Sequence, residues 1–81
     1  MHDPLNPDAA QIARHYRAAL DSVNLINRLI EKNPRTSEDD ATIYRNVQHL
    51  QIMRAKTFWT NEDMKPFDDA IKAGDPQGRI L

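Results

Sequence analysis

The sequence predicts an all-α protein built as an antiparallel helical hairpin with a short third helix. Three observations support this fold class. Apolar residues recur every three or four positions along most of the chain, and no stretch shows the alternation of a β-strand. Pro34 interrupts the apolar series once, and capping signals precede three segments. With 81 residues, the chain is expected to form one domain.

The first helix is expected over residues 7–32, after an N-terminal arm of residues 1–6. Asn6 is a suitable cap, Pro7 has its φ already set for a first helical residue, and Asp8 complements the helix dipole. The main apolar series has the spacing of a helix that lies along a partner, and consists of Ala9, Ile12, Tyr16, Ala19, Val23, Ile26 and Ile30. A second, weaker series consists of Ala18, Ser22, Leu25 and Leu29. A helix with two apolar stripes requires two neighbours.

The second helix is expected over residues 37–58. Pro34 cannot extend the first helix, and Thr36 or Ser37 can open the next one. The main apolar line of the second helix is Ile43, Val47, Leu50 and Phe58, flanked by Tyr44 and Ala55 and, beyond them, by Ala41, Ile52 and Trp59. Because the link between the two helices is short, they are expected to be antiparallel neighbours.

The third helix is expected over residues 61–73. Thr60 and Asp63 have the spacing of a capping box, and Trp59 and Met64 have that of a hydrophobic staple. Gly74 is expected to end this helix in the left-handed conformation. Residues 75–81 are then expected to form a flexible tail.

Composition and motifs narrow the function classes. The chain has no cysteine, and its net charge of −1 creates no field that would attract DNA or an anionic membrane. Neither a transmembrane helix nor the positive region of a secretory signal is present in the sequence, so we expect a cytoplasmic protein. Catalytic motifs and a Gly-rich phosphate loop are absent from it. We therefore expect a protein that is not an enzyme and has no cofactor.

Acidic and histidine side chains do not indicate a metal site. The carboxylates of Asp39-Asp40 and Asp68-Asp69 are sequence neighbours, which point about 100° apart on a helix, so neither pair converges on one ion. They fit a charged helix surface. The three histidines are scattered and give no metal-binding motif.

Self-association is the expected way for so short a chain to gain more core, because it has no disulfide and no metal staple. The residues expected to contact a second copy or a protein partner are Leu25, Leu29, Ile52 and Trp59. Trp59 has two interpretations. It is either a partner-binding anchor or the residue that holds the third helix on the hairpin.

Arg14, Tyr16 and Arg17 form the stretch that looks most like a ligand site. Arginine can hold a phosphate with a fork of donors, and tyrosine can stack on a base. The alternative interpretation is structural, because Tyr16 belongs to the apolar series and the arginines suit a solvated helix face.

Two resemblances bear on function. Residues 44–74, YRNVQHLQIMRAKTFWTNEDMKPFDDAIKAG, resemble small proteins of unassigned function encoded by phages and prophages. Residues 16–38 are similar in spacing to the hairpin of phage proteins that sequester cyclic-nucleotide immune signals. The features that carry the second resemblance are Tyr16, Leu29-Ile30, Pro34 and Ser37-Glu38.

The second resemblance covers under half of the chain. This sequence departs from the pattern of the sequestering proteins at Arg54 and Lys56, where the resemblance implies a more apolar helix end. If it holds, it implies that Tyr16 stacks on a base. The sequence thus predicts a non-enzymatic helical assembly protein, an accessory protein of a phage or prophage. The alternative is a sponge that binds a cyclic nucleotide at a subunit interface.

Overall fold

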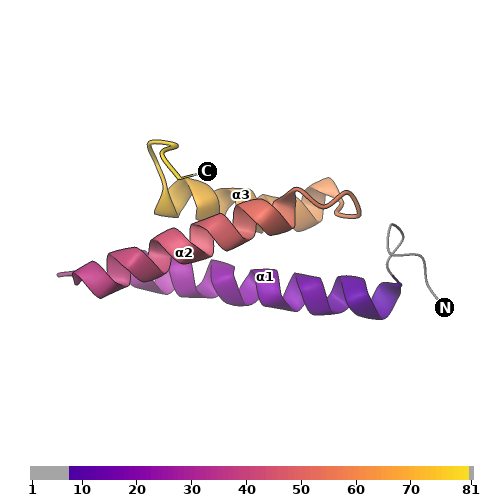
Figure 1. The fold of residues 1–81 in the computed structure, drawn as a ribbon, viewed down its shortest axis with the longest axis horizontal. Coiled ribbons are helices and arrows are strands. Elements are labelled where there is room, and N and C mark those ends of the chain that lie inside the picture. Colours follow the sequence, from indigo (N-terminus) through magenta and orange to yellow (C-terminus); the bar gives the residue numbers. More distant parts are fainter. Residues whose placement is uncertain (1–7, 81) are drawn as a thin grey trace.

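The computed structural model describes residues 8–80, which form three α-helices. These are α1 (Ala9–Ile30), α2 (Ser37–Arg54) and α3 (Asn61–Gly74), and each helix contacts the other two. Figure 1 shows α2 returning alongside α1 after the short link, with α3 lying against the pair. No strand occurs in residues 8–80, so the prediction of an all-α fold is confirmed.

Helix α1 begins two residues later than expected. Asp8 is its cap, and the Asp8 carboxylate accepts a hydrogen bond from the backbone N–H of Gln11 at 2.8 Å. An aspartate at this position both satisfies a free amide and complements the dipole, which explains why the helix starts here. The expected arm of residues 1–6, with the cap Asn6, and Pro7 lie outside the described residues. At the other end α1 stops at Ile30 rather than at residue 32.

Helix α2 begins as expected and ends four residues early. Thr36 and Asp39 form a reciprocal capping box with bonds of 3.0 and 3.1 Å. The helix stops at Arg54 rather than at residue 58. The indole N–H of Trp59 donates to the carbonyl of Met53 at 2.7 Å, so the chain must turn back over the end of α2. The same carbonyl also accepts the backbone N–H of Lys56 at 3.1 Å, so it has two donors at the C-terminus of the helix.

Helix α3 begins at a second capping box, in which Thr60 and Asp63 exchange bonds of 3.2 and 3.1 Å. The expectation that Gly74 is a left-handed cap is wrong. Gly74 is the last helical residue, and the glycine with positive φ in residues 8–80 is Gly78, at 67°. Gly74 is required for another reason: a Cβ atom there would lie 2.7 Å from Cγ2 of Val47.

Residues 75–80 form a compact turn, which differs from the expected loose tail. The carboxylate of Asp75 accepts bonds from the backbone N–H groups of Arg79, at 2.9 Å, and Ile80, at 2.7 Å. The side-chain amide of Gln51 then donates to the Ile80 carbonyl at 2.8 Å. Ile80 packs against the core, so this turn is fastened to α2. Leu81 lies outside the described residues.

The core is formed by all three helices and by the corner between α2 and α3. Its buried apolar residues are Ala19, Val23, Ile26, Ile43, Val47, Leu50, Met53, Trp59, Phe67 and Ala70. One polar contact crosses from α1 to α2, where the Ser22 hydroxyl lies 2.8 Å from Nδ1 of His49. Ser22 is buried, and this bond satisfies its hydroxyl.

Candidate functional site

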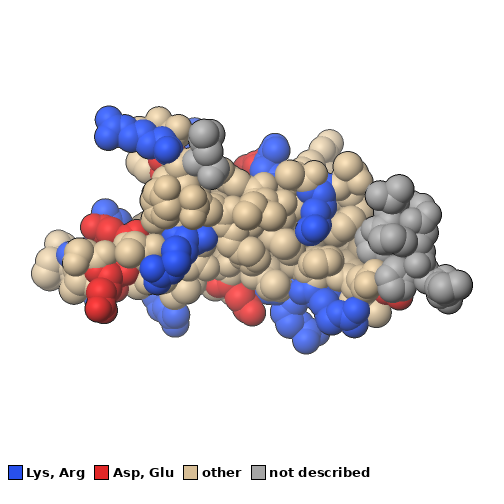
Figure 2. Space-filling model, in the orientation of Figure 1, with Lys and Arg blue, Asp and Glu red and all other residues tan. Residues whose placement is uncertain are grey.

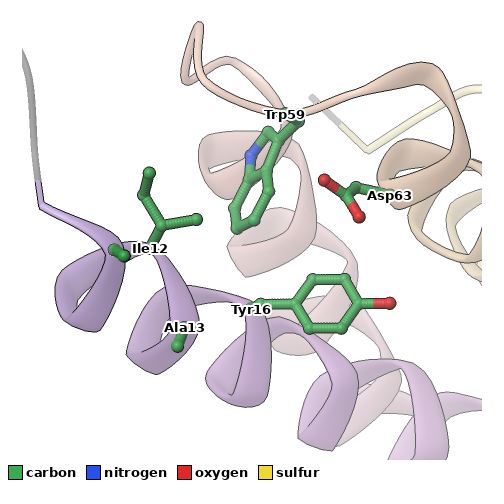
Figure 3. A pocket seen from close by; sticks show the side chains of 6 residues that line it. Ile12, Ala13, Tyr16, Trp59 and Asp63 are labelled. Carbon is green, nitrogen blue, oxygen red and sulfur yellow. The ribbon is translucent and has the colours of Figure 1, made fainter.

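A pocket opens where the first turns of α1 approach the corner before α3. Its volume is about 310 Å³. Figure 3 shows the side chains of Ile12, Tyr16, Trp59 and Asp63 around a common space. Among residues 8–80, its lining is Ala9, Ile12, Ala13, Tyr16, Trp59 and Asp63.

The aromatic wall of this pocket is held in place by several contacts. The Trp59 ring packs edge-to-face on Phe58, at 4.6 Å between centroids, and on Phe67, at 5.2 Å. Its N–H is already bonded to the Met53 carbonyl. The Tyr16 ring lies 6.0 Å from the Trp59 ring. The pocket therefore has a preformed wall with two aromatic rings.

Asp63 is the one charged side chain that residues 8–80 contribute to the lining of this pocket. Its Oδ2 accepts the backbone N–H of Thr60 at 3.2 Å, while Oδ1 has no hydrogen-bond partner among residues 8–80. Figure 3 shows the carboxylate directed toward the space between Trp59 and Tyr16. The pocket therefore combines apolar walls with one negative charge.

The structure does not bring Arg14, Tyr16 and Arg17 together. Tyr16 is half-buried and lines the pocket, whereas Arg14 and Arg17 are exposed and do not line it. The two arginines are three residues apart and share a helix face, from which Tyr16 is displaced. Figure 2 shows basic side chains projecting below the N-terminal half of α1. Neither arginine forms an ion pair within residues 8–80.

The residues expected to contact a partner occupy different environments. Trp59 is 8% exposed and lies in the core, where it offers little surface to a second chain. Leu29 packs against the core, and Leu25 is half-buried. Ile52 is 68% exposed and is the most accessible of the four.

The structure adds Tyr44, 48% exposed, to the accessible apolar surface. Together with Ala41, Gln48 and Ile52 it forms one strip, which we call the outer α2 face. These residues follow a spacing of three, four and four along the helix. Ile52 comes two residues after the fully buried Leu50, which places it on the opposite side of α2 from the core. The apolar pattern predicts that Tyr44 flanks the main apolar line of α2, whereas the structure leaves this side chain 48% exposed.

Two negative findings concern the described residues. No group of three or more His, Asp or Glu side chains in residues 8–80 is placed to hold a metal ion. Among the three helices of this range, none is both long enough and apolar enough to cross a membrane.

No family model matches the chain, and no curated protein or solved structure shows significant similarity to it.

Proposed function

We propose that this chain is a non-enzymatic assembly protein that self-associates through the outer α2 face. The observation that carries the proposal is the joint exposure of Ile52, at 68%, and Tyr44, at 48%, on one side of a helix whose other side is core. Burying an exposed isoleucine side chain stabilises a complex by about 2 kcal/mol. A symmetric dimer would gain this contribution twice.

An antiparallel pair of α2 helices suits this surface. If the two-fold axis passes beside Gln48, Tyr44 of one copy meets Ile52 of the other. Ala41 then approaches Ala55 of the second copy, where small side chains allow close helix packing. Such an interface is isologous, because the same patch is used by both copies.

The charges along α2 favour the same antiparallel direction. Its first turn carries Glu38, Asp39 and Asp40, whereas Arg54 lies in its last turn and Lys56 just beyond. In the antiparallel pair Asp40 of one copy lies toward Lys56 of the other. Lys56 has no ion-pair partner within residues 8–80, and Asp40 is bonded only to Arg35 at 3.3 Å. Exposed ion pairs contribute little energy, so this pairing sets direction more than affinity.

Light scattering coupled to size-exclusion chromatography tests the proposal. The parent chain is expected to have the mass of a dimer or larger oligomer, and Ile52→Lys that of a monomer. Ala73→Lys, an exposed alanine on α3, is the matched control and should retain the parent mass. Asp40→Lys and Lys56→Glu should each weaken association, and their combination should restore it. A monomeric parent at high micromolar concentration would contradict the proposal.

A cyclic-nucleotide sponge is the second candidate, supported by the exposed pair Arg14 and Arg17. Tyr16 lies in a pocket that contains the carboxylate of Asp63, which repels phosphate. Base stacking and phosphate binding would therefore have to come from different copies of the chain. Calorimetric titration with cyclic dinucleotides tests this function, and Arg17→Ala should abolish the heat. An accessory role in a phage or prophage is proposed from the sequence resemblances alone.

A further inference from the structure

The pocket between α1 and the start of α3 has a size and a composition that suit a small organic ligand. Its volume of about 310 Å³ lies at the lower end of the range of small-molecule sites. Four of the six lining residues among residues 8–80 are apolar, namely Ala9, Ile12, Ala13 and Trp59. The two remaining residues, Tyr16 and Asp63, supply a polar aromatic ring and a carboxylate.

The carboxylate determines the charge of the ligand. An anion would be repelled by Asp63, and an uncharged apolar ligand would cover its oxygens without bonding to them. Covering an ionised carboxylate in that way is unfavourable. The dipole of α3 offsets only part of this charge, because a helix N-terminus carries about half an elementary charge. A cation is therefore the complementary ligand.

The aromatic wall determines the remainder of the ligand. Cations attached to methyl groups bind to the faces of Trp and Tyr rings, and the surrounding apolar side chains accommodate the methyl groups. Contacts with Phe58 and Phe67, together with the bond to Met53, fix the Trp59 ring, so little order has to be gained on binding. We propose that this pocket binds a small quaternary ammonium or protonated methylated amine, with its positive charge between Asp63, Trp59 and Tyr16.

Trp59 provides the readout, because it is the one tryptophan of the chain. Its fluorescence is recorded during titration of the full chain with choline and with phenyltrimethylammonium. The uncharged isostere of choline, in which carbon replaces nitrogen, is the ligand control. We expect a saturable change with both cations and at least about tenfold weaker binding of the isostere, the size of effect that one nearby charge produces.

Two charge-removing variants on α3 form a matched pair. Asp63→Asn removes the pocket charge but retains an oxygen that can accept the Thr60 N–H. Glu62→Gln removes an equal charge from an exposed neighbouring position. We expect Asp63→Asn to bind choline about tenfold more weakly and Glu62→Gln to bind it as the parent does. If Asp63→Asn unfolds, Tyr16→Leu replaces it, and loss of the ring should also weaken choline binding.

The proposal is overturned if neither cation produces a saturable change in fluorescence. Equal binding of choline and its uncharged isostere would also overturn it, as would equal effects of the two charge-removing variants. If the fluorescence changes with protein concentration but not with choline, the pocket is occupied by a second copy of the chain. That result would also overturn the proposal.

Discussion

Gly74→Ala tests the packing of α3, because helix propensity and steric overlap change the free energy of unfolding in opposite directions at this position. Alanine is a better helix former than glycine by about 1 kcal/mol in a helix interior, and by less at the last helical residue. The structure predicts the opposite net effect. A Cβ at this position would lie 2.7 Å from Cγ2 of Val47, 3.1 Å from that of Ile43 and 3.3 Å from that of Ile26. Overpacking of this kind costs about 1–3 kcal/mol. We expect a net destabilisation of about 1–2 kcal/mol.

Urea unfolding followed by circular dichroism measures this difference, and a thermal scan provides a second measurement. For a domain of this size, 1 kcal/mol corresponds to a shift of about 4–8 °C in Tm. Ala73→Gly, at the preceding exposed position, is the control that isolates helix propensity. If Gly74→Ala is as stable as the parent or more stable, α3 does not approach α1 and α2 as closely as described.

The remaining predictions concern the core, the C-terminal turn and the dependence of stability on pH. Phe67→Ala should lower the free energy of unfolding by about 3–5 kcal/mol, because Phe67 is fully buried; urea unfolding checks this. Gly78→Ala should lower the free energy of unfolding by about 1 kcal/mol in the same urea experiment. The cause is the φ of 67° alone, because no atom lies within 4 Å of the added Cβ. The backbone N–H of Thr36, and after it Lys32, lower the pKa of Asp39 below 3.8. The resulting stabilisation is present above the unfolded pKa and is lost as pH falls through the folded pKa. Asp39→Asn should therefore lose less stability than the parent on acidification, and unchanged acid sensitivity would contradict the assignment.

Local signals in the sequence were sufficient to locate the starts of α2 and α3. Both capping boxes consist of a threonine and an aspartate three residues later, so the whole interaction lies within one turn. The end of α2 depends on a longer contact. Ala55 and Phe58 continue the apolar period, but the helix ends at Arg54, next to a Met53 carbonyl that accepts both the Lys56 backbone N–H and the Trp59 indole N–H. Periodicity does not encode those bonds.

The candidate pocket could not be predicted because its two halves come from distant segments. The sequence places Asp63 in a capping box, which is confirmed, but its carboxylate also lines a pocket whose other lining residues include Tyr16 and Ile12. The prediction of a left-handed Gly74 is wrong for a similar reason. A glycine near a helix end typically adopts the left-handed conformation, whereas here the approach of Val47 requires it.

Distance measurement between spin labels tests the proposed self-association through the outer α2 face most directly. The chain has no cysteine, so Arg45→Cys introduces a unique attachment site. Arg45 is exposed and lies two turns before Ile52 on the same side of α2. Lys72→Cys, exposed on α3, is the control position. Our proposal predicts dipolar coupling between two chains labelled at residue 45, lost on dilution with unlabelled chain, and weaker coupling at residue 72. Absence of coupling at both positions, or stronger coupling at residue 72, would contradict it.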